Sequence, residues 1–132
     1  EDELGGHARD AARVVLVVDD EELVRETARE MLRQLRCKAL VASDGRQAVE
    51  FYRENGSHVD LVLLDLTMPG LNGTATLREL RAIDPDVRVV IMSGYAFTEI
   101  PSEEETTKTP FLRKPFTLGE LRRVLREALA ER

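Results

Sequence analysis

Short runs of consecutive apolar residues alternate along this chain with longer segments in which apolar residues recur at helical spacing. A continuous apolar run of a few residues is typical of a strand that is buried on both faces of a parallel sheet. The second run is less apolar than the first, which favours a place near the edge of the sheet. The pattern predicts five strands, at residues 13–18, 38–43, 61–65, 87–92 and 111–113.

Amphipathic segments with apolar residues at helical spacing follow the predicted strands. Capping-box patterns at 44–47 and 117–120 predict where two of these helices begin. The fourth segment is the least regular, because Pro101 interrupts it and its acidic residues offer little to bury, so only a short helix is expected there. The predicted helices extend from the acidic run at 19–22 to about residue 36, from 44 to about 55, over 74–82, within 96–109, and from 117 to the last residues.

Strands that alternate with helices form a parallel sheet with helices on both faces. Right-handed crossovers leave few arrangements, and we predict the doubly wound α/β order 2-1-3-4-5 of a flavodoxin-like fold with five helices. A chain of 132 residues has room for one domain with one proper core. We assign that domain to residues 13–132. Residues 1–12, which are acidic and lack an apolar period, are interpreted as a linker or flexible arm.

Composition narrows the range of functions without defining one. The net charge of −6 argues against direct nucleic-acid binding, since phosphate contacts require clustered lysine and arginine. Arg25, Arg29, Arg33 and Arg36 do recur, but acidic residues alternate with them, which favours a solvated helix face. A single cysteine excludes an internal disulfide and fits a reducing compartment. Because no apolar run is long enough to span a membrane, we expect no membrane contact by this domain.

Polar residues stand where the predicted strands end. Asp19 and Asp20 follow the first strand, and Asp65 ends the third. Ser93 follows the fourth strand and Lys114 the fifth. Parallel strands place their carboxyl ends at one edge of the sheet, which is where open α/β sheets bind ligands. We therefore expect these side chains, although far apart in sequence, to converge at that edge.

Acidic side chains gathered at one edge repel each other, by roughly 4 kcal/mol for a pair about 4 Å apart at an effective dielectric near 20. Mg²⁺ would remove that repulsion, because it takes oxygen ligands and commonly uses one or two carboxylates with waters or phosphate oxygens. Together with the ammonium of Lys114 it could stabilise a phosphoryl group that one carboxylate attacks. Taken singly, each residue could instead cap a helix, end a strand, form a turn or pair with a surface acid. Their coincidence at one edge favours aspartyl-phosphate chemistry.

Four motifs span nearly the whole chain. They are VLVVDDE at 15–21, LVLLDLTMPGLNG at 61–73, MSGY at 92–95 and FLRKPF at 111–116. Together these motifs resemble the receiver domain of two-component response regulators. The resemblance implies a phosphorelay in which Asp65 accepts a phosphoryl group from a phosphohistidine. The donor would be a sensor histidine kinase or a histidine phosphotransfer domain.

The same resemblance implies a Mg²⁺ site around Asp65. Asp20 and Asp65 would bind the ion directly, and Asp19 would do so largely through water. The backbone carbonyl of Thr67 would be a further ligand. Lys114 would contact the phosphoryl group, and the peptide bond that follows it, to a proline, is expected to be cis.

Switching and tuning residues are also implied by the resemblance. Ser93 would move to meet the phosphate, and Phe111 would follow as an aromatic switch, although a plain core role for Phe111 is an equally good interpretation. Thr67 and Tyr95 occupy positions that tune autodephosphorylation in the family, or they are simply variable surface residues. Gly94 would leave the phosphate accessible.

The segment at 98–109 departs from the family pattern, which has a regular amphipathic helix there. That face commonly carries dimerisation and output, so the resemblance allows a weak homodimer but does not define one. The glycine-containing leader, the SGY pattern at 93–95 and the end of the chain after the last helix resemble receivers of hybrid sensor histidine kinases. We therefore expect a cytoplasmic domain whose parent chain could be a membrane-anchored hybrid kinase.

Other functions remain open at this point. A haloacid-dehalogenase-like phosphatase also forms an aspartyl phosphate, but it requires a second aspartate where this chain has Thr67. A flavin-binding protein of the same fold would require a phosphate-cradling loop after the first strand. A protein-interaction module that is never phosphorylated would tend to lose the site residues that this chain has.

A receiver catalyses its own phosphorylation and dephosphorylation, so it is not an enzyme in the conventional sense.

Overall fold

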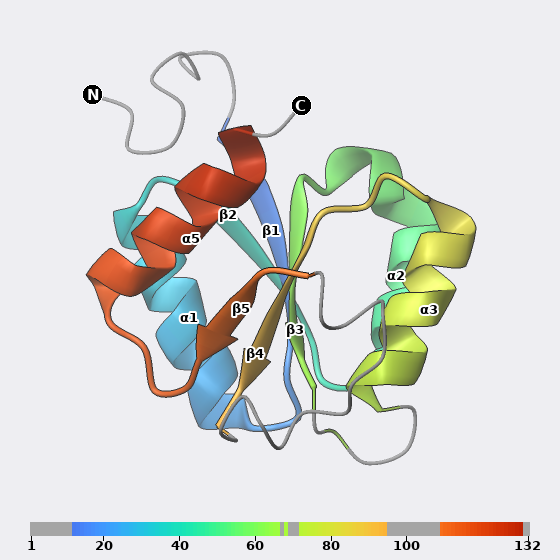
Figure 1. Ribbon diagram of the computed structural model, residues 1–132, viewed down its shortest axis with the longest axis horizontal. Helices are drawn as coiled ribbons and strands as arrows, with labels where there is room; N and C mark the ends of the chain where they lie inside the picture. The colour runs from blue at the N-terminus through green and yellow to red at the C-terminus, as the bar shows by residue number, and fades with distance from the viewer. Residues whose placement is uncertain (1–11, 67, 69–71, 95–108, 131–132) are drawn as a thin grey trace.

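The structure is a computed structural model, which describes residues 12–66, 68, 72–94 and 109–130. One sheet runs through the described residues, and each pair of neighbouring strands in it is parallel (Figure 1). The strands are β1 (Val14–Val18), β2 (Lys38–Ala42), β3 (Leu61–Asp65), β4 (Val89–Ser93) and β5 (Phe111–Arg113). Their order, β2-β1-β3-β4-β5, confirms the predicted doubly wound topology.

Helices cover both faces of this sheet (Figure 1). On one face lie α1 (Glu22–Gln34) and α5 (Leu118–Ala130). On the other face lie α2 (Gly45–Asn55) and α3 (Gly73–Ile83), with a short 3₁₀ turn, η1 (Gly56–His58), after α2. The alternation of apolar runs and amphipathic segments in the sequence therefore corresponds to alternating strands and helices.

Some predictions fall outside the described part of the chain or differ from it in detail. The helix expected within 96–109 and the arm expected at 1–12 lie almost entirely outside the described residues. The fourth strand begins at Val89, two residues later than predicted. The reason is a turn in which the N–H of Val87 donates to the carbonyl of Asp84 at 3.0 Å, so that Val87 is bonded before the ladder begins.

The two faces of the sheet carry separate apolar clusters, because successive residues of a strand point to opposite sides. In β1, Val15 and Val17 pack with residues of α1 and α5, whereas Leu16 and Val18 pack with residues of α2 and α3. Burial of each large aliphatic side chain stabilises the fold by roughly 2 kcal/mol. The sheet is thus fixed on both sides, which fixes the position of its carboxyl edge.

Side-chain caps start the helices that follow two of the strands. At α2, Oδ1 of Asp44 accepts the N–H of Gln47 at 2.8 Å. At α5, Oγ1 of Thr117 accepts the N–H of Glu120 at 3.1 Å, and Oε1 of Glu120 accepts the N–H of Thr117 at 2.9 Å. Both predicted helix starts are confirmed. One detail differs, since Oε1 of Gln47 accepts the N–H of Ser43, one residue before the cap, at 2.6 Å.

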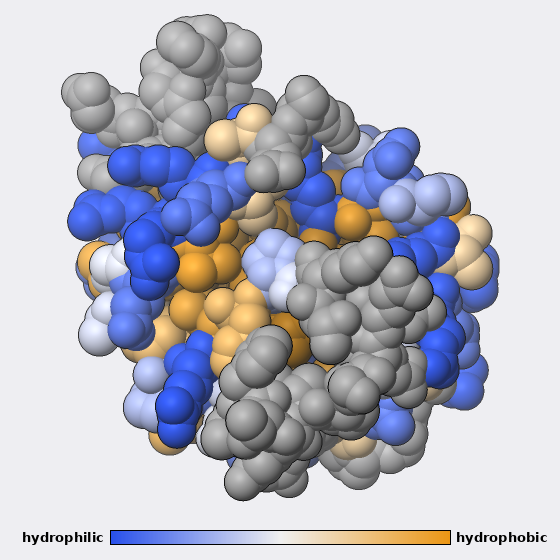
Figure 2. Space-filling view, in the orientation of Figure 1, coloured by the Kyte–Doolittle hydropathy of each residue, from blue (hydrophilic) through white to orange (hydrophobic). Residues whose placement is uncertain are grey.

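The surface in the same orientation is mostly polar over the helices (Figure 2). Apolar residues reach it around β5, beside α5, where the sheet ends at an edge strand. Among the described residues, no helix is both long and apolar enough to cross a membrane.

Candidate functional site

The carboxyl ends of the strands bring the predicted polar residues together. Asp65 ends β3 and pairs in register with Met92 of β4, and Ser93 ends β4 and pairs with Arg113 of β5. Carboxylate oxygens of Asp19, Asp20 and Asp65 lie within 4.8 Å of one another. The expectation that residues far apart in sequence converge at this edge is therefore confirmed for the acids.

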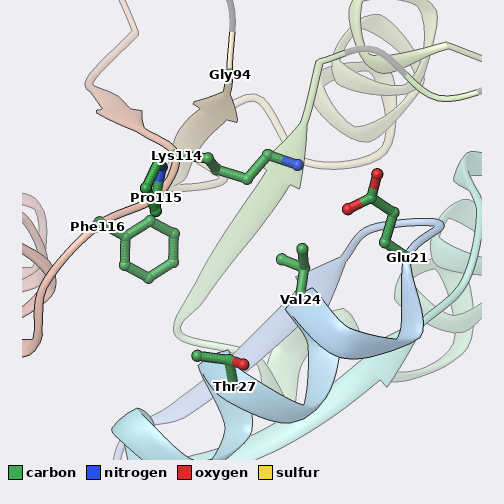
Figure 3. Close-up of a pocket in the computed structure, with 7 residues that line it drawn as sticks. All are labelled: Glu21, Val24, Thr27, Gly94, Lys114, Pro115 and Phe116. Atoms are coloured by element: carbon green, nitrogen blue, oxygen red, sulfur yellow. The ribbon is translucent and has the colours of Figure 1, made fainter.

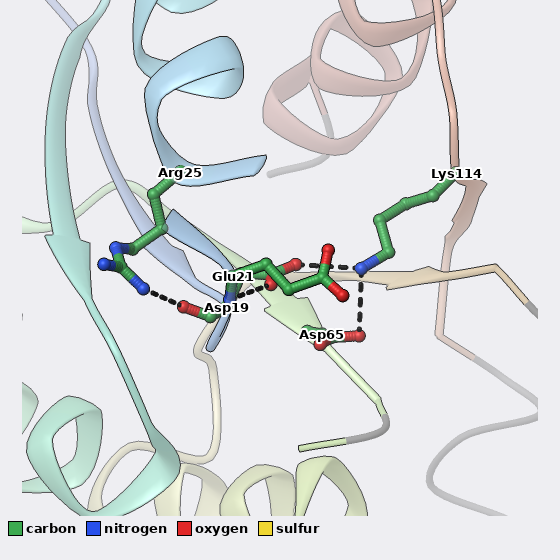
Figure 4. A network of polar contacts seen from close by, with 5 residues as sticks. All are labelled: Asp19, Glu21, Arg25, Asp65 and Lys114. Atoms are coloured by element: carbon green, nitrogen blue, oxygen red, sulfur yellow. Dashed lines mark hydrogen bonds and ion pairs between the residues drawn. The ribbon is translucent and has the colours of Figure 1, made fainter. Parts of the chain in front are cut away.

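Asp19 is tightly held, and its residue is 0% exposed. Its Oδ1 accepts the N–H of Glu21 at 2.9 Å, and its Oδ2 accepts a hydrogen bond from Nζ of Lys114 at 3.0 Å (Figure 4). Its own N–H donates to the carbonyl of Ala42 at 3.2 Å, which extends the contact between β1 and β2 by one residue. Burial of this carboxylate is tolerable because both of its oxygens are bonded.

Lys114 joins two of the acids. Its Nζ lies 3.0 Å from Oδ2 of Asp19 and 3.5 Å from Oδ1 of Asp65, and its side chain is 18% exposed. Burial by itself lowers the pKa of Lys114, but the hydrogen bond to Asp19 and the charges of Asp65, Asp19 and Glu21 outweigh it and raise the pKa. The ammonium therefore stays protonated between the acids at neutral pH.

The backbone around Lys114 is also fixed. Its N–H donates to the carbonyl of Ser93 at 2.8 Å, which ties the end of β5 to the end of β4. The bond from Lys114 to Pro115 is cis, as expected. The lysine therefore enters the site from a defined position on the neighbouring strand.

The acids fit a hard divalent cation by their chemistry. All three offer carboxylate oxygens, the donors that Mg²⁺ takes. Asp65 is 2% exposed, whereas Asp20 is exposed, so the cluster is closed on the protein side and open on the solvent side. An open side suits an ion that keeps several of its waters.

Space beside Lys114 is open. A pocket of about 430 Å³ lies between the start of α1 and the segment that joins β5 to α5 (Figure 3). Gly94 is exposed, and a Cβ placed on it would meet nothing within 4 Å. The pocket is lined by Glu21, Val24, Thr27, Gly94, Lys114, Pro115 and Phe116. Lys114 therefore borders open space on this side.

Two predicted switch residues lie on the neighbouring strands β4 and β5. Ser93 is fully buried as the last residue of β4. Phe111 is partly buried as the first residue of β5 and packs against the apolar cluster on the α2 and α3 face. Thr67 and Tyr95 lie outside the described residues.

Arg25 is a site residue that the sequence analysis missed. The alternating charges around it favour a solvated face, but it is only partly exposed, and its Nη1 donates to the carbonyl of Asp19 at 2.8 Å (Figure 4). Because this partner is a backbone carbonyl, no pattern of side chains in the sequence indicates the contact.

A doubly wound sheet with three acids and a lysine at its carboxyl edge defines a class of protein, namely α/β domains that bind a cation and an anionic group there. The chain belongs to the response regulator receiver domain family, which matches residues 15–126. The predicted resemblance to this family is confirmed.

Several known proteins are similar to the chain. It is 36% identical over 119 residues to the sensor kinase CckA of Brucella abortus, and 30% identical over 116 residues to the sporulation initiation phosphotransferase F of Bacillus subtilis. Its structure is similar to the receiver domain of a sensor histidine kinase from Pseudomonas aeruginosa PAO1, with a TM-score of 0.83 and 27% identity. That match covers 92% of this chain and 100% of the other, whose magnesium ion is coordinated in the active-site cleft.

The share of each relative that is matched differs widely. The match covers 87% of this chain but only 12% of CckA, whereas it covers 87% of this chain and 92% of the phosphotransferase. The chain therefore spans about an eighth of the length of the first relative and most of the second.

Proposed function

We propose that this receiver domain is the phosphoryl acceptor of a phosphorelay and that Asp65 is the accepting residue. A carboxylate oxygen of Asp65 attacks phosphorus of a phosphohistidine, the phosphorus–nitrogen bond breaks, and the imidazole leaves with the electron pair and takes up a proton. The observation that carries this proposal is the position of Nζ of Lys114, 3.5 Å from Asp65 within a cluster of three acids.

Asp20, Asp65, the carbonyl of Thr67 and, through water, Asp19 would hold Mg²⁺. When bound, the ion supplies positive charge that stabilises the phosphoryl oxygens. Asp19 holds Lys114 at 3.0 Å, and the lysine would contact the phosphoryl group. Because Asp20 is exposed, an ion bound there would have room to keep some of its waters.

The switch would follow from the new charge on Asp65. Ser93 would donate a hydrogen bond to the phosphoryl oxygens, and Phe111 would change its packing, which shifts a two-state equilibrium. Thr67 and Tyr95 would set how quickly water removes the phosphoryl group, and the open space at Gly94 would leave it accessible. Ser93 pairs with Arg113, two residues after Phe111, so the pairing of β4 with β5 would carry a movement of Ser93 to Phe111.

The parent chain is a further part of the proposal. The similarity to receivers of sensor kinases supports a hybrid histidine kinase, with a cytoplasmic receiver at 13–132 and a kinase or histidine phosphotransfer domain as its partner. A helix within 96–109 would complete the family's five-helix fold, and its outer face would be the place to look for a weak homodimer.

Mass spectrometry of the intact protein tests the acceptor. We expect wild type to gain one phosphoryl group from acetyl phosphate or from a phosphorylated histidine phosphotransfer domain, and only with Mg²⁺. Asp65→Asn should gain none, while Asp86→Asn, which removes an exposed acid in a distant turn, should label like wild type. Labelling of Asp65→Asn at the wild-type level would refute the assignment. A folded wild type that binds Mg²⁺ but gains no phosphoryl group from either donor would favour an interaction module.

A further inference from the structure

Arg25 hydrogen-bonds to the backbone of the acid cluster rather than to a carboxylate. Its Nη1 donates to the carbonyl of Asp19 at 2.8 Å, and its own N–H donates to the carbonyl of Glu21 at 3.1 Å in the first turn of α1. The side chain therefore reaches back from the helix to the loop that carries the acids (Figure 4).

That contact has a counterpart on the other side of Asp20. The carbonyl of Asp19 belongs to the peptide group before Asp20, and Arg25 holds it. The N–H of Glu21 belongs to the peptide group after Asp20, and Oδ1 of Asp19 holds it at 2.9 Å. Both peptide groups that flank Asp20 are thus fixed, although its side chain is exposed.

We propose that Arg25 is a positioning residue for the divalent cation, acting through the backbone on the direction of the Asp20 carboxylate. The inference rests on the proposed function, since it concerns the same metal site. If the loop that carries Asp20 could rotate freely, Mg²⁺ binding would have to immobilise it, at a cost in conformational entropy. A loop fixed before the ion arrives avoids that cost, and a hydrogen bond from a charged donor is strong enough to fix it.

The sign of the effect separates positioning from simple electrostatics. A guanidinium beside a cation site repels the cation, so neutralising Arg25 would strengthen Mg²⁺ binding if charge alone mattered. If Arg25 positions Asp20, the same substitution weakens binding. The two accounts therefore predict opposite changes for one variant.

Arg29 provides the matched control. It lies one turn further along α1, its side chain is 50% exposed, and its Nη2 is 3.9 Å from Oε2 of Glu26. Arg29→Gln removes the same charge from the same helix but leaves the contact to Asp19 in place. We expect it to change the dissociation constant for Mg²⁺ by less than about twofold, because exposed charges are screened by salt.

The test is a titration of the 132-residue chain with Mg²⁺ alone, followed by NMR shifts of backbone amides, for wild type, Arg25→Gln and Arg29→Gln. We expect Arg25→Gln to raise the dissociation constant about tenfold, the lower end of the loss seen when an outer-shell partner of a metal ligand is removed. The Mg²⁺ concentration for half-maximal phosphorylation should rise by a similar factor, with the rate at saturating Mg²⁺ unchanged.

Unfolding in EDTA distinguishes positioning from a purely structural role. If Arg25→Gln is less stable in EDTA but binds Mg²⁺ as tightly as wild type, or more tightly, the inference is wrong while the metal site itself stands. If wild type shows no saturable Mg²⁺ binding, the proposed metal site and the inference both fail. Weaker binding by Arg25→Gln alone, with Arg29→Gln like wild type, supports the inference.

Discussion

Lys114 is the residue on which the charge balance of the site depends. Its ammonium contacts Asp19, which is 0% exposed, and Asp65, which is 2% exposed. We predict that Lys114→Met lowers the free energy of unfolding in EDTA by about 3 kcal/mol, the lower end of the cost of breaking a buried ion pair. Mg²⁺ should then stabilise the variant more than it stabilises wild type, because the ion replaces the lost positive charge. Urea unfolding with EDTA and with excess Mg²⁺ measures both effects.

Lys38→Met is the control, since Lys38 is an exposed lysine on the edge strand β2. Equal stabilisation of wild type and Lys114→Met by Mg²⁺ would contradict the prediction.

The dependence of stability on alkaline pH gives a second check on Lys114. The pKa of Lys114 is raised above its ordinary 10.5. The stability that the charged lysine contributes to the fold is therefore fully present below pH 10.5 and is lost as the pH rises through the raised pKa. The stability difference between wild type and Lys114→Met should therefore shrink as the pH rises through that alkaline range.

The acids and the lysine could be predicted from the sequence because each stands where an apolar run ends. Which of the first two acids is buried could not be predicted. Asp19 is buried and Asp20 exposed because the N–H of Asp19 still bonds to Ala42, so the chain leaves the sheet only after it. The role of Arg25 was hidden for a related reason, since its partner is a backbone carbonyl that no side-chain pattern reports.

At the scale of elements, the start of α3 lies very close to the end of β3. The N–H of Gly73 donates to the carbonyl of Leu66 at 3.0 Å. A Cβ on Gly73 would collide with Cα of Leu66 and lie 2.6 Å from the carbonyl oxygen of Asp65. We predict that Gly73→Ala lowers the free energy of unfolding by about 2 kcal/mol, within the range for overpacking, and weakens Mg²⁺ binding by displacing the end of β3. Thermal or urea unfolding and the Mg²⁺ titration measure these changes.

Gly119→Ala is the matched substitution with the opposite expected sign. Gly119 is exposed in the first turn of α5, where the nearest atom to an added Cβ is Oγ1 of Thr117 at 4.0 Å. Alanine there should raise the free energy of unfolding by about 0.5 kcal/mol through its better helix propensity. If both variants were destabilised alike, the close approach at Gly73 would not be the cause.

The start of an element could be predicted where the residues that determine it lie close together in the sequence, and not where distant contacts help to determine it. The box at 117–120 lies entirely within four residues, so sequence suffices to locate the start of α5. The turn before β4 has a local hydrogen bond, from the N–H of Val87 to the carbonyl of Asp84, but a distant residue also holds it. The side chain of Asp84 also accepts a hydrogen bond from the hydroxyl of Tyr52 on α2 at 2.8 Å. Burial and this bond raise the pKa of Tyr52, and a partner 32 residues away leaves no local trace in the sequence.

For the whole molecule, the topology that creates the site also concentrates charge at one edge of the sheet. The order β2-β1-β3-β4-β5 places the ends of β1 and β3 side by side, so their acids must face each other. Lys114 offsets part of the repulsion, but it is one positive charge among three acids. We therefore expect the fold to be less stable than the same fold with fewer acids at this edge, and a bound cation should restore the difference.

The variant Asp20→Asn tests how repulsion among the acids affects the stability of the whole fold. Because Asp20 is exposed, its repulsion with each neighbouring acid is at most about 1 kcal/mol, the value for charges near 4 Å apart in water. We predict that Asp20→Asn is more stable than wild type in EDTA by up to about that amount. Wild type should gain about 2.7 kcal/mol when Mg²⁺ reaches roughly one hundred times its dissociation constant, and the variant should gain far less at the same concentration.

Wild type and Asp20→Asn should therefore exchange rank in stability between EDTA and Mg²⁺. In EDTA, Asp20→Asn has the higher melting temperature, and in saturating Mg²⁺ wild type has it. Calorimetry under both conditions measures the exchange, with Asp86→Asn as an exposed acid outside the cluster that should behave like wild type in each. If wild type is the more stable protein in EDTA as well, then Asp20 contributes to the fold directly and the acids are not in conflict. An exchange of rank would mean that the stability lost at this edge is recovered by the ion that the acids bind.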